Sequence, residues 1–494
     1  MLEGIETQFQ DLNNIFKCFT LSNVLSNNDI LDLMESAHML ICETINESPM
    51  LYIKPKFHEI IFDMVYEILE QSMDEIHDEH VLHNIIDKAF STYYSKNNPP
   101  RSYKGTFIRF NCEMEKMTAK IEYLRNIPQP EQRTKEWYEF RHNYLTASNV
   151  WKCFISESSK NQLIYEKCCP INTEKFKHVS ITSPLHWGQK YEPVSILWYE
   201  FYYKTTITDY GCLPHETIPH LAASPDGINT CTNSQLYGRM LEVKNIWNRV
   251  INGIPKMEYW IQMQVQMEVC KLNDCDFLET RFVEYINRDA FFEDGTFQKT
   301  LDGKYKGIIM YFIKDGAPHY EYAPFQATEK EFGKWEEEMM IKNDGFTWNS
   351  NLYWRLDEIS CVLVVRNKLW FNASTSMMSD LWQTVLKERK SGYEHRAPKK
   401  RKPTALEPVE TDKPVETDKP VETDKSVETD KSVETDKPVE TDKSVETDKS
   451  VETDKSVEKV KKYNRKTKSD NIIIQIETEP HSNGDKSNIP NNEQ

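Results

Sequence analysis

Two carboxylates and a lysine occur close together near the middle of this 494-residue chain. Asp226 stands in S-P-D-G, where proline and glycine on either side are typical of a tight turn. Glu242 and Lys244 follow in M-L-E-V-K-N, where they alternate with apolar residues and therefore share one face if the segment is a strand. Taken singly they read as a turn aspartate and a surface ion pair. Taken together, the two carboxylates and the lysine lead to the hypothesis that all three form one cluster.

Such a cluster has the composition of a site for metal-dependent hydrolysis of a phosphodiester. Carboxylate oxygens are hard ligands suited to Mg²⁺. A neighbouring lysine can orient or help deprotonate an attacking water, and it can stabilise charge that builds on a phosphate.

Three more polar residues flank this cluster in the sequence. Glu192 ends W-G-Q-K-Y-E, and the run that follows predicts a helix over 194–203 with Pro193 in its first turn. Tyr259 and Gln262 are three apart and share one face of a helix. Their segment, 256–271, alternates like a strand, but its Gln, Met and Glu content favours helix, which we predict. Each residue alone also fits an ordinary surface or packing role.

In this order and spacing, the motifs resemble the lambda-type exonuclease, or YqaJ-like viral recombinase, family of PD-(D/E)XK nucleases. The resemblance spans residues 133–286 and includes an upstream motif, R-T-x-x-W-x-x-x-R-x-x-x-L-T-A-S, that ends at Ser148. It implies an α/β (α+β) restriction-endonuclease-like core, a central mixed sheet flanked by helices. Glu192 would lie on an early helix, Asp226 and the E-x-K strand on a hairpin, and the helix of Gln262 behind.

The resemblance also implies a role for each matching residue. Asp226, Glu242 and the Val243 carbonyl would hold Mg²⁺, for which Mn²⁺ substitutes, and Glu192 would support a second metal or its waters. Lys244 would act on the nucleophilic water.

The remaining matches concern positioning and the DNA end. Gln262 would help to position the metals, and Tyr259 belongs to the same catalytic motif. Arg141 and Ser148 would bind a 5′-phosphate, the feature that sets direction in 5′-to-3′ resection. Family members form ring-shaped homotrimers and often work with a single-strand annealing protein. The N-terminal helical addition puts that ring geometry in doubt here.

Periodicity and composition predict four segments along the chain. Apolar residues at helical spacing over 30–45 and 57–69 indicate a helical start, and eight V-E-T-D-K repeats with almost no apolar material indicate a disordered end. A basic run at 399–402 resembles a nuclear-import signal and fits phosphate binding equally well. The segments are a helical N-terminal domain (1–128), a nuclease core (129–323), an extension of the folded part (324–395) and a tail (396–494).

Charge and hydropathy narrow the function. A net charge of -17 argues against coating nucleic acid by bulk charge, so DNA contact must be local. No apolar run could cross a bilayer and no secretory leader is evident, which predicts an intracellular protein. Packaging of the protein in virions is left open. We expect a Mg²⁺-dependent exonuclease acting on linear duplex ends in recombination or genome processing of a large DNA virus. The alternatives are a structure-selective endonuclease on the same core and a non-catalytic DNA-binding or virion protein.

Overall fold

The computed structural model describes residues 26–72, 79–109, 113–132, 134–171 and 180–398. All of these belong to one compact unit, Met1–Thr404. The V-E-T-D-K repeats and the basic run at 399–402 lie outside the described residues. The four predicted segment boundaries therefore stay a prediction.

The N-terminal part is built from helices whose buried positions recur at helical spacing. Ser26 caps the first helix, where its hydroxyl and the Asp29 carboxylate each accept a backbone N–H of the other residue. The predicted helices at 30–45 and 57–69 are confirmed. The elements are α2 (Asn27–Glu47), the 3-10 helix η1 (Pro49–Ile53), α3 (Phe57–Ser72), α4 (Glu79–Lys96) and α5 (Met114–Asn126).

The next part carries the residues singled out above, and it alternates short strands with helices. It comprises α6 (Lys135–His142), β1 (Leu145–Thr146), α7 (Ala147–Val150), η2 (Trp151–Cys153), α8 (Glu157–Cys168), α9 (Pro184–Tyr203), β2 (Ile207–Thr208), β3 (Leu213–Pro214), β4 (Leu221–Ala223), β5 (Gly227–Asn229), β6 (Met240–Asn245), α10 (Met257–Cys270) and β7 (Asp274–Glu284). The helix predicted over 256–271 is thus confirmed as α10.

The chain then closes the sheet and ends on a long helix. These elements are α11 (Arg288–Glu293), β8 (Lys306–Lys314), β9 (Ala317–Tyr322), α12 (Glu329–Lys342), β10 (Thr347–Val365), α13 (Lys368–Ser391) and η4 (Glu394–Arg396). Strand β10 and helix α13 are the longest of these elements, with 19 and 24 residues, and in both of them residues of mixed polarity flank a buried apolar part.

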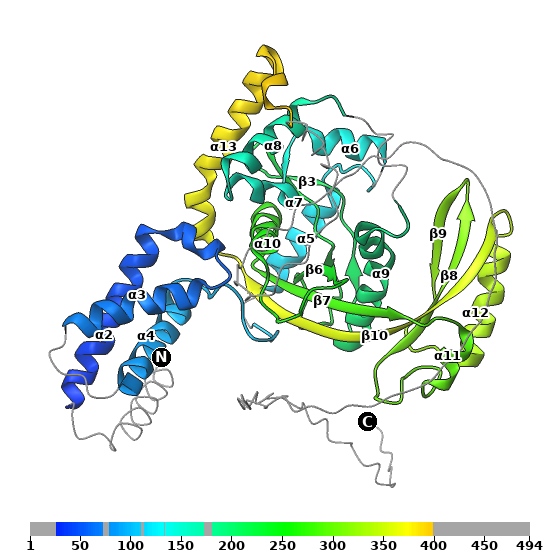
Figure 1. Cartoon of the computed structure of the whole chain (residues 1–494), viewed down its shortest axis with the longest axis horizontal. Helices are drawn as coiled ribbons and strands as arrows, with labels where there is room; N and C mark the ends of the chain where they lie inside the picture. The colour runs from blue at the N-terminus through cyan, green and yellow to red at the C-terminus, as the bar shows by residue number, and fades with distance from the viewer. Residues whose placement is uncertain (1–25, 73–78, 110–112, 133, 172–179, 399–494) are drawn as a thin grey trace, which may run out of the picture. The chain divides into compact units, whose positions relative to one another are not determined.

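The main sheet has seven strands in the order β2-β5-β6-β7-β10-β8-β9. Only β6 and β7 pair in parallel, and the other neighbours are antiparallel. A second sheet, β1-β4-β3, pairs β1 with β4 in parallel. Helices α9 and α10 flank β6 and β7 (Figure 1). A mixed sheet flanked by helices is the predicted fold class, which is confirmed.

Alternation along β6 assigns its residues to two cores. Met240 packs in the core that includes α10, whereas Leu241 and Val243 pack in the core that includes α9. By the same period of two, Glu242 points toward the α10 side. Strand β6 thus places the carboxylate of Glu242 in the core next to α10.

Helix α9 differs from its prediction at its start. Ser183 accepts a hydrogen bond from His186 N, and Pro184 occupies the first turn, so the helix begins there and Pro193 lies inside it. Proline at the first helical position costs no hydrogen bond, whereas Pro193 removes one from the helix interior. Tyr191 and Val194, close to Pro193 on the same helix, are buried in the core between α9 and the sheet.

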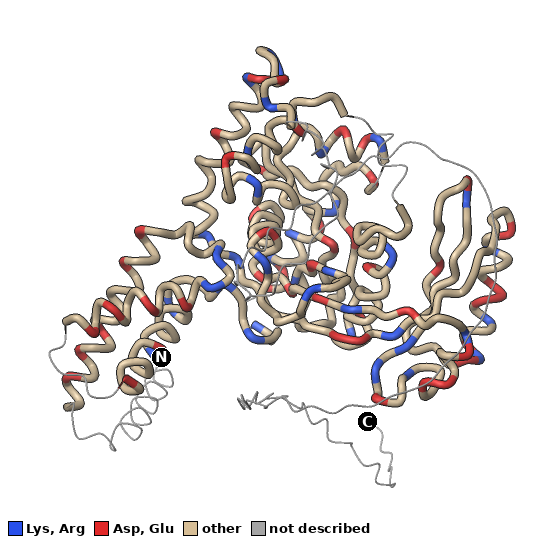
Figure 2. The backbone as a smooth tube through the Cα atoms, in the orientation of Figure 1, with Lys and Arg blue, Asp and Glu red and all other residues tan. Residues whose placement is uncertain are grey.

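Acidic charge is concentrated away from the centre of the sheet. Helices α2 and α3 carry aspartates and glutamates and no lysine or arginine, as Figure 2 shows. Blue and red residues alternate over the elements that surround β6 and β7. None of the helices within the described residues combines the length and the apolar composition that crossing a bilayer requires.

Candidate active site

The β5–β6 hairpin brings Asp226 against the strand that carries the E-x-K motif. Val243 N donates a 2.8 Å hydrogen bond to Asp226 Oδ2 across the hairpin. Gly227 pairs with Leu241 in the register, and a Cβ at Gly227 would overlap the side chain of Ile207 on β2. Glycine at this point therefore allows β2 and β5 to approach closely.

Glu242 is the most buried charged group of the hairpin, with no exposed surface. Its Oε1 accepts a hydrogen bond from Lys244 Nζ, and its Oε2 accepts one from Gln266 Nε2 at 2.7 Å. Burial, reinforced by the nearby charge of Asp226, raises the pKa of Glu242 to about 7, although Lys244 and Gln266 oppose the shift. A cation beside the two carboxylates would relieve this cost.

Lys244 is held by several groups at once. Its Nζ also lies 3.2 Å from the Val243 carbonyl oxygen and 5.2 Å from the ring centre of Tyr259. Burial lowers the pKa of Lys244, but Glu242 and Asp226 outweigh burial, so the pKa lies above its ordinary value and the amine stays protonated.

The glutamate nearest to Lys244 on the next strand is neutralised separately. Glu279 on β7 is the register partner of Lys244, and it forms an ion pair with Arg249. Lys244 therefore forms its ion pair with Glu242, and Glu279 forms a separate one with Arg249.

The structure replaces one predicted contact by another on α10. Gln266 Nε2 donates both to Glu242 and to the Ser224 carbonyl, at 3.1 Å, and its Oε1 is buried without a hydrogen-bond donor among the described residues. Gln262, which the sequence predicts here, is half-buried, and its side chain makes no hydrogen bond with the described residues. The two glutamines are four residues apart, so they share a helix face and the sequence could have pointed to either. We call Asp226, Glu242, Lys244 and Gln266 the carboxylate cluster.

Glu192 is not part of one compact three-carboxylate group. It is half-buried on α9, whose residues Tyr191 and Val194 pack on the sheet face opposite to Glu242. Within the residues that the structure describes, no group of three or more His, Cys, Asp or Glu side chains is arranged to hold a metal ion. The assignment of Glu192 to a metal stays a prediction.

The two residues predicted to bind a 5′-phosphate do meet. Arg141 Nη2 donates to Ser148 Oγ at 2.8 Å, and Arg141 Nη1 donates to Ser224 Oγ at 3.3 Å. The guanidinium stacks on Trp137, with Cζ 4.2 Å from the ring centre. Ser224 was not singled out from the sequence, although it stands two residues before Asp226. It joins this group to the carboxylate cluster, because its carbonyl accepts from Gln266.

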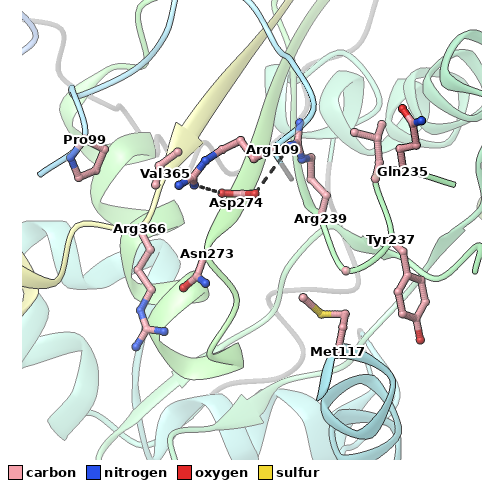
Figure 3. A pocket seen from close by; sticks show the side chains of 12 residues that line it. Pro99, Arg109, Met117, Gln235, Tyr237, Arg239, Asn273, Asp274, Val365 and Arg366 are labelled. Atoms are coloured by element: carbon pink, nitrogen blue, oxygen red, sulfur yellow. Dashed lines mark hydrogen bonds and ion pairs between the residues drawn. The ribbon is translucent and has the colours of Figure 1, made fainter. Parts of the chain in front are cut away.

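A cavity of about 300 Å³ lies next to Asp274, at the start of β7 (Figure 3). Three arginines line it, but each is already paired. Asp274 accepts from Arg109 and lies 3.7 Å from Arg239, which also contacts Asp276 at 3.2 Å. Arg366 pairs with Glu268 on α10. The network ties the segment before α5 to the sheet, and its cations have counter-charges, so we assign the cavity a structural role.

The fold and the site together define a mixed α/β protein with a carboxylate–lysine cluster on a hairpin next to an arginine–serine cluster. Residues 136–273 match the model of the YqaJ-like viral recombinase domain, and this part of the chain is similar to that family. The match extends from α6 to just beyond α10. It therefore contains all the residues of the carboxylate cluster and of the arginine–serine cluster. The family resemblance drawn from the motifs is confirmed.

A viral relative and two solved structures are also similar to the chain. An uncharacterized protein, R354, of Acanthamoeba polyphaga mimivirus is 29% identical over 329 residues, which are 58% of this chain and 57% of the relative. The chain thus spans little more than half the length of that relative. Two crystal structures of an alkaline exonuclease from Laribacter hongkongensis, one in complex with dAMP, are 18% identical, with TM-scores of 0.32 and 0.31. Each covers 53% of this chain and 97% of its own, a distant likeness.

Proposed function

We propose that this chain is a metal-dependent deoxyribonuclease, an exonuclease that hydrolyses phosphodiesters from the ends of linear duplex DNA in viral recombination. The observation that carries the proposal is the carboxylate cluster. Two carboxylates and a lysine, predicted from separate motifs, meet across one hairpin beside a hydroxyl-lined arginine. Its place inside the YqaJ-like domain supports the same activity.

The donor set fits a hard divalent cation, for which we propose Mg²⁺. Asp226, Glu242 and the Val243 carbonyl would hold it, and all three offer oxygen. The raised pKa of Glu242 and the unpaired Oε1 of Gln266 both mark a place where positive charge is favoured. When bound, the cation supplies charge stabilisation and an acidified water.

The side chains of the chain have separate tasks in this proposal. Lys244, kept protonated by its neighbours, orients the attacking water and stabilises charge on the phosphate; it is not the proton acceptor. Tyr259 supports the ammonium through its ring, and Gln266 fixes the rotamer of Glu242. The water oxygen bonds to phosphorus and gives up a proton to solvent, the bond between phosphorus and the ester oxygen breaks, and the leaving oxygen takes up a proton from solvent.

The polarity is also part of the proposal. Arg141, Ser148 and Ser224 would bind the 5′-phosphate of the strand being cut, because a guanidinium flanked by hydroxyl groups matches the oxygens of a terminal phosphate. An enzyme that recognises this group acts 5′-to-3′.

The test is digestion of linear duplex DNA with Mg²⁺, with covalently closed circles as the second substrate. We expect the wild type to degrade the linear DNA only, and Lys244→Ala to degrade neither. Cutting of circles by the wild type would favour a structure-selective endonuclease on the same core. Binding of DNA without cutting of either substrate would favour a non-catalytic module.

A further inference from the structure

The arginine of the proposed phosphate site lies on a short helix whose end is held from two distant parts of the chain. Helix α6 ends at His142, one residue after Arg141. Lys167, in the last turn of α8, donates from Nζ to the Arg141 carbonyl at 2.7 Å. Arg389, near the end of α13, donates from Nη2 to the His142 carbonyl at 2.9 Å. The last carbonyls of a helix lack intrahelical donors, and basic side chains stabilise them.

Arg389 uses its whole guanidinium for this purpose. Nε donates to the Lys167 carbonyl at 2.9 Å, and Nη1 donates to Asn143 Oδ1 at 3.2 Å. Nη2 also lies 3.3 Å from His142 Nδ1, while Nε2 of that ring contacts the Cys169 carbonyl at 2.9 Å. One side chain thus fastens the ends of α6 and α8 together, and Figure 1 shows α13 running beside α8.

The three cations Arg141, Lys167 and Arg389, which we call the cation cluster, have no ion-pair partner among the described residues. Lys167 is only 6% exposed. Elsewhere in the fold the buried Arg239 and the half-buried Arg249 and Arg366 are each paired with a carboxylate. The buried Arg101 is the exception among the described arginines, since its guanidinium has no hydrogen-bond partner there. Burying positive charge without a counter-charge is unfavourable, and an anion at Arg141 would offset it.

We infer that Lys167 and Arg389 are positioning residues for Arg141, and that α13 completes the site that receives the terminal phosphate. This inference rests on the proposed function. Arg389 lies well beyond residue 273, so the matched domain does not contain it. A guanidinium must be held at a fixed angle to form two parallel hydrogen bonds with a phosphate, and the end of α6 sets that angle.

Binding without turnover tests the inference apart from catalysis. Fluorescence anisotropy with Ca²⁺ in place of Mg²⁺ measures Kd for a short duplex with a 5′-phosphate and for the same duplex with a 5′-hydroxyl. We expect Arg389→Met to lower the wild-type preference for phosphate by about tenfold, through weaker binding of the phosphorylated end. Arg389→Lys keeps the positive charge and the aliphatic part of the side chain but loses the planar guanidinium with its several donors, and this variant should lose most of the preference as well.

The matched control is Arg396→Met. Arg396 also joins α8 to α13, through Asn161 and Glu388, but does not touch α6. It should keep the preference within about twofold, as expected of a residue outside the site. Steady-state cleavage adds a second readout, because a positioning role raises KM for phosphorylated ends more than it lowers kcat.

Three outcomes would overturn the inference. The first is a preference that is unchanged in a folded Arg389→Lys protein. The second is an equal loss in Arg396→Met, which would indicate general loosening of α13. The third is a wild type that degrades linear DNA and binds both duplexes equally, which would leave the proposed nuclease standing and remove the phosphate site. A wild type that neither binds nor cuts DNA would instead reject the proposed function itself, and this inference with it.

Discussion

Two charged clusters meet at Ser224, and they are built in opposite ways. In the carboxylate cluster, Glu242 has its counter-charge within the same strand, and Gln266 fills its second oxygen. In the cation cluster, hydrogen bonds run to backbone carbonyls and hydroxyls, and no described carboxylate balances the three charges. In the first cluster Lys244 balances only one of the two carboxylates, so a cation would be favourable there, whereas the second cluster would be stabilised by an anion from outside the chain. Side by side, they suit a substrate that carries phosphate.

The largest expected effect is on the carboxylate cluster. Glu242→Gln keeps the shape of the side chain but removes the charge that would hold a cation, and we expect cleavage to fall by at least about a hundredfold. Electrophoretic shift should show DNA binding largely intact. Glu268→Gln is the control, because Glu268 is a carboxylate on α10 that pairs with Arg366 outside the cluster. Normal cleavage by Glu242→Gln would remove the metal assignment.

The two clusters also differ in how far the sequence could predict them. Asp226, Glu242 and Lys244 lie on one hairpin, so strand alternation and turn composition suffice to bring them together. The role predicted for Gln262 stays a prediction. Gln266, which the structure places against Glu242, was not singled out from the sequence, because helical periodicity identifies a face but cannot choose between two residues one turn apart on it.

The cation cluster was only half predicted. Arg141 and Ser148 are seven residues apart in one motif, and the structure brings them into contact. Lys167 and Arg389 come from helices distant in sequence, and nothing local marks a lysine that will be buried or an arginine that will cap another helix. Contacts of that kind follow from tertiary packing alone.

The second prediction concerns the anion that the cation cluster lacks. Arg141→Ala removes the side chain that contacts both serines, and we expect the ratio of cleavage rates on 5′-phosphorylated and 5′-hydroxyl ends to fall by about tenfold or more. Time courses on the two linear duplexes, run in parallel, measure this ratio. If this ratio stays at the wild-type value, Arg141 does not bind the 5′-phosphate, and the cation cluster is not a substrate-binding site.

The third prediction concerns the pH dependence of stability. Burial, with smaller contributions from Arg141 and Arg389, lowers the pKa of Lys167 to about 7, against the opposing effects of Cys212 and Glu166. Its unfolded pKa is about 10.4, so between these values the unfolded chain binds more protons and stability rises with pH. The cost of burying the charge is complete below pH 7 and disappears toward pH 10.4.

Urea denaturation of wild type and Lys167→Met between pH 6.5 and 9.5 measures this contribution. The free energy of unfolding of the wild type should rise relative to the variant by at most about 1.4 kcal/mol per pH unit. Groups that titrate in both proteins cancel in the difference. Parallel curves would mean that Lys167 keeps its charge at all these pH values, which requires a counter-charge that the described residues do not provide.

The smallest effect is expected at Arg101, a buried cation that belongs to neither cluster. Arg101 is 5% exposed, and its three guanidinium nitrogens have no hydrogen-bond partner among the described residues. Burial lowers its pKa to about 9, although the charge of Glu258 opposes the shift, and its guanidinium lies 5.8 Å from the ring centre of Trp260. Because an unpaired buried charge is unfavourable, Arg101→Met should raise the free energy of unfolding by about 1–3 kcal/mol.

The same variant should cleave linear DNA at the wild-type rate, which distinguishes it from Arg141→Ala. Urea denaturation and the digestion assay together give both values for one protein. A stabilised and active Arg101→Met would show that this chain bears the cost of an unpaired cation at a position without function, so that only the contacts of Arg141 mark the cation cluster as a binding site. A destabilised variant would mean that the packing of the Arg101 side chain and its contact with Trp260 outweigh the cost of the buried charge. In that case an unpaired buried cation is not by itself unfavourable in this chain, and the argument for an external anion at Arg141 would rest on the hydrogen bonds of Arg141 with the two serines.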